Sequence, residues 1–384
     1  MSTLSPDEIF ERGHSVWAEI DLASVRHNIS VLDDMTSGAE VMGVVKGYAY
    51  GHGNPQTAKA MLQGGATRLG VARVAEGIHL RDAGIDAPIH VLSEAPPQSA
   101  PAIVEHRLTA AVYTEPFARA LSEAATEKGL EVPVHLKIDT GMHRAGMAAD
   151  TALRTVATIR ELEGLEIEGV WSHLAVADVP DHPYTRKQLD LFVDLAGQIE
   201  NETGSIPMKH IANSAAALSL PESHLDLVRC GIASYGLWPG PQMSDVADLR
   251  PVLALRARIG LVKSVAAGAA LSYGLNYELA TDGNVVTVAA GYADGYDRRL
   301  SGLAAVLIDG RRYKVSGTVT MDQFMVDVGD AQFQVGDTVT LIGGDGGERI
   351  TAEELAEQIG TINYEVTTRI PSRVPRIFMS EQNS

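Results

Sequence analysis

Residues 41–73 of the 384-residue chain are VMGVVKGYAYGHGNPQTAKAMLQGGATRLGVAR, and they contain the repeating unit from which the fold can be predicted. The unit begins with a short apolar run, Val41–Lys46, continues through a helical segment, Asn54–Leu62, and ends with a second apolar run, Arg68–Arg73. A strand, a helix and a strand in this order form a parallel pair joined by a right-handed crossover. The stretch therefore predicts one β-α-β unit.

The same alternation continues on the carboxyl side of this unit. Further strands are predicted at Pro88–Ser93, Thr109–Tyr113, Pro133–Ile138, Ile167–His173, Met208–Asn213 and Leu227–Ser234. Further helices are predicted at Ala75–Ala83, Glu115–Lys128, Thr151–Leu162 and Pro183–Glu200. Eight strands that alternate with helices predict a closed (β/α)8 TIM-type barrel. A doubly wound parallel sheet is the alternative.

The pattern changes near Pro251, where helices give way to successive strands separated by glycine-containing turns. The predicted strands are Leu253–Val265, Val285–Ala290, Ala304–Ile308, Arg312–Val319, Met325–Val328 and Thr338–Ile342. One helix is predicted at Thr351–Ile359, where Thr351 and Glu354 have the spacing of a capping box. The second part of the chain is therefore expected to be mostly β.

These patterns divide the chain into three parts. We expect an N-terminal tail at residues 1–16, a barrel domain at 17–250 and a C-terminal β domain at 251–384. Trp17–Leu22 precedes the first barrel helix, and it could join the β domain as a strand.

The composition excludes several classes of partner. The chain has 31 basic and 49 acidic residues and a net charge of −18, which disfavours binding to nucleic acid or an anionic membrane. Cys230 is the only cysteine, which suits a reducing compartment. Met1–His14 lacks the apolar core of a secretory signal, and no run of 18 apolar residues occurs. We therefore expect a cytoplasmic protein.

Several polar side chains fall at or near the ends of predicted barrel strands, where TIM-type barrels gather their reactive groups. They are Lys46, Lys137, His173, Asn213, Ser214 and Arg229. Lys46 is the most informative, because an ammonium at the end of an apolar strand is costly to bury without a partner or a shifted pKa. Its functional interpretation is a Schiff-base lysine that holds pyridoxal phosphate. Position alone leaves a solvated lysine as the alternative.

A longer segment around this lysine, Val44–Gly53, closely resembles the cofactor-lysine segment of alanine racemases. Other motifs resemble the same family, in the family's order and across both predicted domains. They are KIDTGMHRAG (137–146), WSH (171–173), ANS (212–214), RCGI (229–232), SYG (272–274), GYADGY (291–296), MDQ (321–323) and TINYE (361–365). This ordered set covers most of the chain and is much more specific than any one match.

The resemblance implies a pyridoxal-phosphate-dependent racemase that interconverts L-alanine and D-alanine and supplies D-alanine for peptidoglycan. Lys46 would bind the cofactor and move a proton on one face of the substrate α-carbon. Tyr273 would move a proton on the opposite face, and it would come from the other subunit of a homodimer. Delivery of the proton from the opposite face inverts the carbon centre.

Other matched positions imply contacts with the cofactor. Arg229 matches the arginine that hydrogen-bonds the pyridine nitrogen, and His173 matches its partner. Arg144 matches an arginine near the cofactor's phenolic oxygen that also serves the substrate. Lys137 matches a lysine that family members often carry as a carbamate, which orients that arginine.

The remaining matches concern the cofactor phosphate and the substrate. The phosphate positions are Tyr50, Ser214, Gly231, Ile232 and Tyr364, and Asn213 is assigned to the same cofactor site. Met321 matches a residue whose backbone N–H meets the substrate carboxylate, and Tyr292 matches a tyrosine that lines substrate access. The chain departs from the family's usual residues at Gly47-Tyr48, Cys230 and Thr320, and none of these changes removes a reacting group.

Three other functions are compatible with parts of the pattern. A racemase of another small amino acid, such as serine, would share the catalytic residues and differ in its pocket. A non-catalytic pyridoxal-phosphate-binding protein on a similar barrel would lack the β domain and Tyr273. A decarboxylase with a barrel and a β domain would carry other motifs. The 12 histidines show no HExxH or cysteine-pair spacing, so no metal site is predicted.

Overall fold

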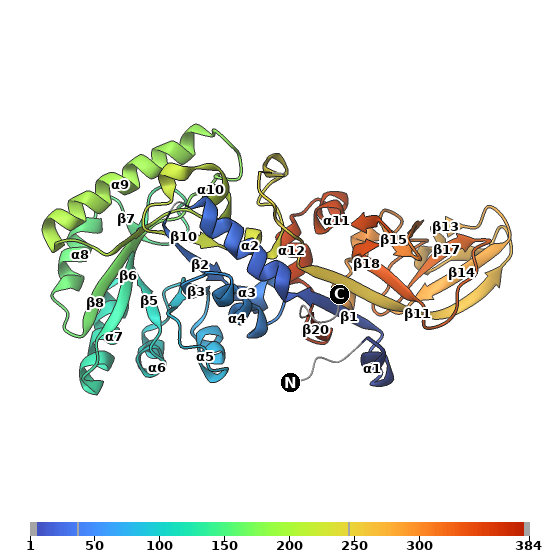
Figure 1. The fold of residues 1–384 in the computed structure, drawn as a ribbon, viewed down its shortest axis with the longest axis horizontal. Helices are drawn as coiled ribbons and strands as arrows, with labels where there is room; N and C mark the ends of the chain where they lie inside the picture. Colours follow the sequence, from blue (N-terminus) through green and yellow to red (C-terminus); the bar gives the residue numbers. More distant parts are fainter. Residues whose placement is uncertain (1–5, 37, 245, 380–384) are drawn as a thin grey trace. The chain divides into compact units, whose positions relative to one another are not determined.

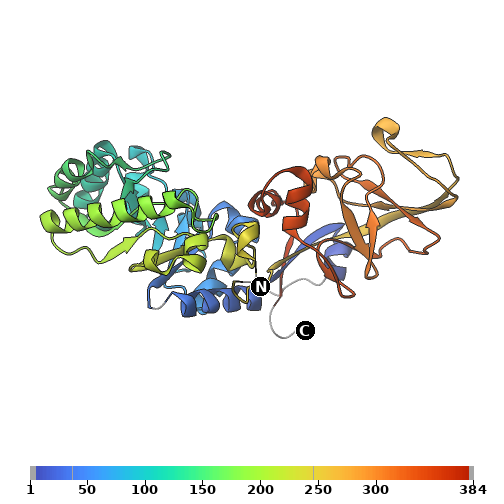
Figure 2. The ribbon, with the colours of Figure 1, turned by 90° about the horizontal axis from the view of Figure 1, so that it is seen from above.

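The computed structural model describes residues 6–36, 38–244 and 246–379, and it divides into two compact units. The barrel unit contains Ser24–Ala49 and Asn54–Arg250. The β unit contains the residues up to Ala23, the short segment Tyr50–Gly53 and the residues from Pro251 onward. Helices surround the strands of the barrel unit, whereas strands predominate in the β unit (Figures 1 and 2).

Eight parallel strands form the sheet of the barrel unit, in the order β10-β2-β3-β4-β5-β6-β8-β9. They are β2 (Glu40–Val44), β3 (Arg68–Val71), β4 (Ile89–Val91), β5 (Thr109–Val112), β6 (Val132–Asp139), β8 (Leu165–Trp171), β9 (Met208–His210) and β10 (Leu227–Cys230). Backbone hydrogen bonds of 3.1 Å, from Asp226 N to Lys209 O and from Arg229 N to Ala212 O, join the two end strands. The predicted barrel is thus confirmed, and the doubly wound alternative is wrong. The short strand β7 (Met147–Ala148) adds to β6.

Eight helices of the described barrel unit accompany these strands. They are α2 (Leu22–Met35), α4 (Gln56–Gln63), α5 (Val74–Asp82), α6 (Ala100–Glu105), α7 (Glu115–Lys128), α8 (Ala152–Arg160), α9 (Pro183–Thr203) and α10 (Ser214–Ser219). In α7, Phe117, Leu121 and Ala125 recur every four residues and are buried, so they form a single apolar stripe. Gly129 follows the helix in the left-handed conformation that commonly ends helices, and α7 has the predicted bounds.

The β unit is built around a sheet of order β16-β15-β18-β11-β1-β20. Its strands are β1 (Val16–Asp21), β11 (Leu253–Val265), β12 (Ala270–Leu271), β13 (Tyr277–Glu278), β14 (Gly283–Val288), β15 (Ala305–Ile308), β16 (Arg311–Lys314), β17 (Phe324–Gly329), β18 (Thr338–Asp345), β19 (Glu348–Ile350) and β20 (Arg376–Met379). β1 pairs antiparallel with β11 and parallel with β20. The strand predicted at Trp17–Leu22 therefore joins the β unit.

In the described part of the β unit, three α-helices accompany the strands: α1 (Pro6–Glu11), α11 (Ala352–Ile359) and α12 (Asn363–Thr368). The Thr351 hydroxyl accepts a 3.0 Å hydrogen bond from Glu354 N and so caps α11. The Glu354 carboxylate binds Arg312, so of the predicted capping box only the Thr351 half is seen. The segment expected as a tail is partly helical, because Ile9 of α1 packs against Trp17 and Ile377. Its first five residues lie outside the described part.

The segment Tyr50–Gly53 belongs to the β unit although it lies between barrel elements in the sequence. Arg376 donates two hydrogen bonds to Gly51 O, from Nε at 3.0 Å and from Nη2 at 2.7 Å. A Cβ at Gly51 would lie 2.0 Å from Thr367 O, so only glycine fits there. No helix in the described ranges is long and apolar enough to cross a membrane.

Candidate active site

Lys46 directly follows Val45, which continues from β2, and it begins an unusual turn, α3 (Lys46–Tyr50). The turn is left-handed, with φ values of 62° at Gly47, 57° at Tyr48 and 55° at Ala49. Such a conformation is unfavourable for residues other than glycine, so neighbouring groups must hold it. It places the lysine at the carboxyl end of a barrel strand, where the sequence analysis expected it.

The Glu76 carboxylate is one group that holds this turn. One oxygen accepts a 2.7 Å hydrogen bond from Gly47 N, and the other accepts bonds of 2.8 and 2.9 Å from Ala72 N and Arg73 N. Because these last two residues follow β3, the carboxylate joins the lysine turn to the neighbouring strand end.

The strain in this turn leads to a stability prediction for Tyr48. We expect Tyr48→Asn to raise the free energy of unfolding by about 1 kcal/mol, because asparagine adopts the left-handed conformation more readily than tyrosine. Tyr48→Phe is the matched control, since it keeps the unfavourable backbone conformation. Urea unfolding of both variants measures the effect, and an asparagine variant no more stable than the phenylalanine variant would contradict it.

Four cationic side chains gather around the carboxyl ends of the barrel strands. Arg144 and Arg229 both lower the pKa of Lys46, in addition to the larger effect of burial. The same two arginines and Lys46 act on Lys137, whose pKa falls to about 8, mainly because of burial. Lys137 Nζ lies 4.4 Å from the centre of the Trp171 ring. A lowered pKa leaves a larger share of each amine neutral and nucleophilic.

The carboxylates that raise the pKa values of these two lysines are Glu76 and Asp139. Both carboxylates also accept hydrogen bonds from backbone N–H groups. The bonds to Asp139 come from Gly141 N at 2.9 Å and from His143 N at 3.0 Å. Arg144 makes no hydrogen bond or ion pair with any described residue. The cluster therefore carries an excess of positive charge, which suits an anionic ligand such as a phosphate ester with a carboxylate.

Arg229 is buried, and both of its Nη atoms make hydrogen bonds. Its Nη1 donates to His210 at 2.8 Å, and its Nη2 lies within 3.1 Å of Ser172 O, Ile211 O and His173 Nδ1. Burial lowers its pKa to about 9, so the guanidinium stays protonated at neutral pH. Burial and the nearby cations also hold the pKa of His173 well below its usual range, so this imidazole is neutral and can accept from the guanidinium.

The lowered pKa of Lys137 predicts a pH-dependent effect on stability. Between pH 8 and 10.5 the unfolded chain holds this proton and the folded chain does not, so wild-type stability rises with pH across that interval. Below pH 8 the cost of burying the ammonium is fully present. We therefore expect Lys137→Met to raise the free energy of unfolding at pH 7 by up to about 3 kcal/mol.

The measurement is urea unfolding of the cofactor-free protein at pH 7 and near pH 10, in buffer freed of CO2 so that the amine stays unmodified. Lys128→Met, at a lysine that is 41% exposed, provides the control for the loss of a charge. The advantage of the Lys137 variant should shrink towards the higher pH. An advantage that grows with pH would contradict the prediction.

Residues assigned to the phosphate group lie together in the barrel unit. Ser214 begins α10, and its Oγ accepts a 2.8 Å hydrogen bond from Gly231 N. Ile232 follows directly, after β10. The Asn213 side chain accepts from Ala216 N at 3.1 Å and caps α10. These hydroxyl, amide and helix-terminal groups are physically suited to an anion.

Two other assigned residues, Tyr50 and Tyr364, meet within the β unit. Their ring centres are 6.1 Å apart, with the planes tilted by 46°. Burial raises the pKa of Tyr50 far above its usual value, so its hydroxyl remains protonated and able to donate.

Tyr273, Tyr292 and Met321 lie in three loops of the β unit that bond to one another. Thr318 Oγ1 donates to Tyr273 O at 2.7 Å, and Tyr292 N donates to Thr320 O at 3.1 Å. All three assigned side chains are exposed, Tyr273 by 74% and Met321 by 53%. A group of exposed apolar and aromatic side chains is typical of a protein interface.

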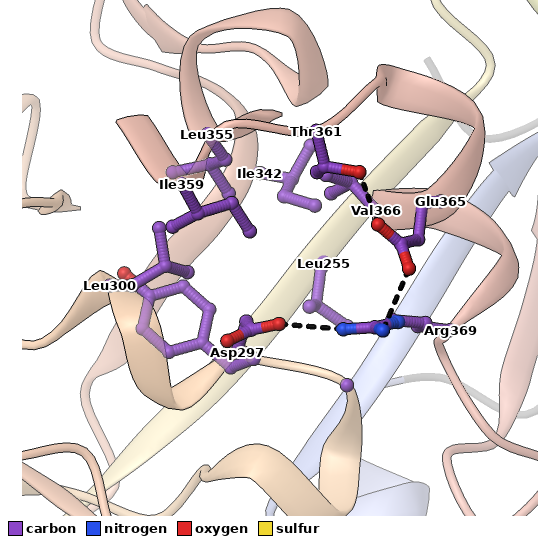
Figure 3. Close-up of a pocket in the computed structure, with 12 residues that line it drawn as sticks. Leu255, Asp297, Leu300, Ile342, Leu355, Ile359, Thr361, Glu365, Val366 and Arg369 are labelled. Atoms are coloured by element: carbon purple, nitrogen blue, oxygen red, sulfur yellow. Dashed lines mark hydrogen bonds and ion pairs between the residues drawn. The ribbon is translucent and has the colours of Figure 1, made fainter. Parts of the chain in front are cut away.

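A separate small pocket in the β unit is a poorer candidate (Figure 3). Apolar side chains line one side of it, whereas on the other side Arg369 bridges Asp297 and Glu365 at 2.7 Å each. Thr361 donates to the same Glu365. These charged groups and Thr361 therefore satisfy one another, whereas the buried hydroxyl of Tyr296, which also lines the pocket, has no hydrogen-bond partner among the described residues.

Several residues that support this region were not predicted from the sequence, namely Glu76, His135, Glu168 and His210. His135 could have been found, because it lies two residues before Lys137 in β6 and so faces the same side of the strand. Glu76 could not, because its contact with Gly47 depends on the turn that follows Lys46.

A closed barrel of parallel strands, with a lysine of lowered pKa and a cationic cluster at the strand ends, defines an enzyme of the (β/α)8 class whose strand ends are suited to an anionic ligand. Residues 20–239 match the family model for the alanine racemase N-terminal domain, and residues 252–378 match that for the alanine racemase C-terminal domain. The chain belongs to the alanine racemase family.

Individual relatives agree with this assignment. Alanine racemase of Symbiobacterium thermophilum is 44% identical over 366 residues, which are 95% of this chain and 97% of that protein. The crystal structure of alanine racemase from Streptomyces lavendulae has a TM-score of 0.91 and 39% identity, covering 95% of this chain and 97% of that one. A histidine racemase of Leuconostoc mesenteroides is also similar, with a TM-score of 0.87 and 30% identity over 99% of this chain and 100% of that one.

Proposed function

We propose that this chain is an enzyme that interconverts L-alanine and D-alanine with pyridoxal 5′-phosphate as its cofactor. The observation that carries the proposal is Lys46, an amine of lowered pKa at the end of a barrel strand beside Arg144 and Arg229. A neutral amine in a cationic surrounding is suited to covalent binding of an aldehyde that bears a phosphate. Alanine as the substrate is supported by the relatives, which are named alanine racemases.

When bound, the cofactor withdraws electrons from the substrate α-carbon and so acidifies its proton. Arg229 would donate a hydrogen bond to the pyridine nitrogen, oriented by its bond to His173. Because a guanidinium keeps its proton, that nitrogen would stay unprotonated, and the weaker electron withdrawal disfavours transamination.

The phosphate of the cofactor would be bound by hydroxyl and backbone N–H groups. Barrel-unit donors are supported by the grouping of Ser214, Gly231 and Ile232, with Asn213 capping the adjacent helix. The hydroxyls of Tyr50 and Tyr364 would supply further donors.

Two side chains would move the proton at the α-carbon. Lys46 Nζ would take or give it on one face, and Tyr273 Oη of the partner subunit would do so on the other. Removal by one and delivery by the other inverts the centre. Met321 N would bind the substrate carboxylate together with Arg144, and Tyr292 would line substrate access.

Lys137 would carry a carbamate in this proposal. The ammonium first loses one proton, and the lone pair of the neutral Nζ then bonds to the carbon of CO2 while one C=O π pair moves onto oxygen. Nitrogen loses a second proton, so two released protons convert a cation into an anion. The pKa of about 8 supports this, because part of the amine is then neutral at physiological pH. The anion would bind and orient Arg144.

The test is incubation of the purified protein with cofactor and L-alanine, followed by chiral chromatography of the amino acid. L-serine and L-histidine are run in parallel, since a histidine racemase shares the fold. We expect D-alanine to form fastest. If cofactor binds but alanine is unchanged, the activity on alanine is refuted, and inversion of serine or histidine would name another substrate.

The same proposal includes the setting of the enzyme. It would act as a homodimer in the cytoplasm, without nucleic-acid or membrane partners, and supply D-alanine for peptidoglycan. The single cysteine and the net charge of −18 support this setting.

A further inference from the structure

A row of polar side chains, all buried except the partly exposed Glu168, crosses the interior of the barrel unit from Arg229 to Arg68. Arg229 Nη1 lies 2.8 Å from His210 Nδ1, and His210 Nε2 lies 2.7 Å from His135 Nδ1. His135 Nε2 lies 2.8 Å from Glu168 Oε2. Arg68 contacts both oxygens of that carboxylate, at 3.1 and 2.9 Å. Five strands thus contribute one side chain each: β10, β9, β6, β8 and β3.

The chemistry of the two ends determines the direction of every hydrogen bond between them. Arg229 can only donate, so His210 Nδ1 must accept and its Nε2 must carry the proton. His210 Nε2–H then donates to His135 Nδ1, and His135 Nε2–H donates to Glu168. An ionised carboxylate can only accept, so the requirement from the Glu168 end is the same. Both imidazoles are therefore neutral Nε2–H tautomers.

The titration properties of the row agree with this assignment. Burial holds the pKa of His210 well below its usual range and also lowers that of His135. The bonds from His135 and Arg68 outweigh burial and lower the pKa of Glu168 to about 2, so it is ionised. A protonated imidazole in the row would direct one N–H at another N–H.

The surrounding residues fit the row closely. A Cβ at Gly169 would lie 2.6 Å from His135 Nδ1, so glycine at this strand position leaves room for the imidazole. Trp171 stacks on His210 with ring centres 5.5 Å apart and planes within 6°. Both imidazoles are fully buried.

His90 is packed against the same rings but takes no part in the row. Its ring centre is 4.5 Å from that of His135, yet neither of its nitrogens has a hydrogen-bond partner. The three histidines lie close enough to suggest a metal site. The hydrogen bonds occupy both nitrogens of His135 and of His210, and two guanidinium groups flank the cluster, so we do not assign a metal.

We propose that Glu168 is a positioning residue for the racemase reaction, acting through the relay His135–His210 as the distant counter-charge that holds Arg229 in one orientation. The proposal rests on the function proposed above, in which Arg229 serves the cofactor. The relay places a carboxylate at the far end of a polarised chain of hydrogen bonds, so the guanidinium is stabilised without an anion next to the cofactor.

The first test compares matched substitutions of the two carboxylates that contact Arg68, those of Glu168 and Glu40. Glu168→Gln keeps the shape and removes the charge from the relay. Glu40→Gln removes the charge of the other carboxylate on Arg68, which lies 3.2 Å from Nε and has no bond to the relay. His90→Leu controls for altered packing around the imidazoles.

For Glu168→Gln we expect kcat to fall about tenfold and KM to change less than twofold. Loss of a hydrogen-bond partner that orients a metal-ligating side chain typically lowers activity about 10- to 100-fold, and we expect an effect at the lower end of that range. The share of turnovers that end in transamination, measured as keto acid formed, should rise. Glu40→Gln and His90→Leu should match the wild type in both readouts. If Glu168→Gln matches Glu40→Gln instead, the proposal is overturned.

The second test does not depend on catalysis. In ¹⁵N-histidine-labelled protein, NMR shifts distinguish a protonated from an unprotonated ring nitrogen. We expect His135 and His210 to be Nε2–H tautomers in the wild type, and His210 to remain so in His135→Phe, because Arg229 still donates to its Nδ1. A protonated Nδ1 on either residue would refute the relay. A wild type without racemase activity would refute the proposed function instead, so the two failures are distinguishable.

Discussion

Replacement of Lys46 by alanine is expected to abolish racemisation, with a loss on the order of 10⁴-fold or more, because this side chain is assigned both the covalent bond to the cofactor and one of the two proton transfers. The amine cannot be replaced by a neighbour. Lys137 is the nearest chemical equivalent, but it belongs to β6, on another part of the barrel wall. Chiral chromatography measures the activity, and absorbance of the dialysed protein measures covalently bound cofactor.

Lys59→Ala serves as the control, since it removes a lysine from α4, outside the cationic cluster. It should retain cofactor and activity. Circular dichroism of the Lys46 variant should match the wild type, because the left-handed turn is held through the backbone N–H of Gly47 and not through the lysine. A folded Lys46→Ala protein that still racemises alanine would contradict the catalytic role assigned to Lys46.

Replacement of Tyr273 by phenylalanine is expected to lower activity by about 10²–10⁴-fold, the usual contribution of a positioned acid/base group. Cofactor binding should persist, because the tyrosine is assigned to the substrate proton alone. Tyr313→Phe, in β16, is the matched control for loss of a phenol. If Tyr273→Phe keeps full activity, another group supplies the second proton.

The 74% exposure of Tyr273 makes the dimer itself testable. Mixtures of Lys46→Ala and Tyr273→Phe protein, unfolded and refolded together, should regain about a quarter of wild-type activity. Half of the dimers would be mixed, and each would hold one intact pair of Lys46 and Tyr273. If both groups came from one chain, every site would carry a lesion and no activity would return.

The barrel could be predicted from the sequence because its strands are buried on both faces and therefore appear as short apolar runs. Their ends were less predictable. His173 and Asn213 were placed within strands, but β8 ends at Trp171 and β9 at His210, and loops carry the polar residues beyond. The helix α12 was missed because its residues, Asn363–Thr368, include valine and threonines, which have weak helix propensity.

The left-handed turn after Lys46 was also unpredictable, because Tyr48, Ala49 and Tyr50 give no local reason for positive φ. The hydrogen bond to Glu76, which is distant in sequence, helps to hold it. For the candidate site, strand ends alone drew attention to Lys46, Lys137 and Arg229. The roles of Arg144 and Tyr273 depended on the family resemblance, because a loop's position in space cannot be inferred from spacing.

The placement of β1 has a consequence for the order in which the protein can fold during synthesis. This strand, Val16–Asp21, leaves the ribosome before any barrel strand, yet its two partners are β11 and β20. It must therefore remain unpaired until more than 230 further residues have been made, since β11 begins at Leu253. At about 5–20 residues per second, that wait lasts on the order of ten seconds or more. Truncation before β11 would leave β1 as an open edge able to pair with other chains. Nascent chains of this enzyme should accordingly be most prone to aggregate while the barrel is being synthesised, and should lose that tendency once β11 and β20 have emerged.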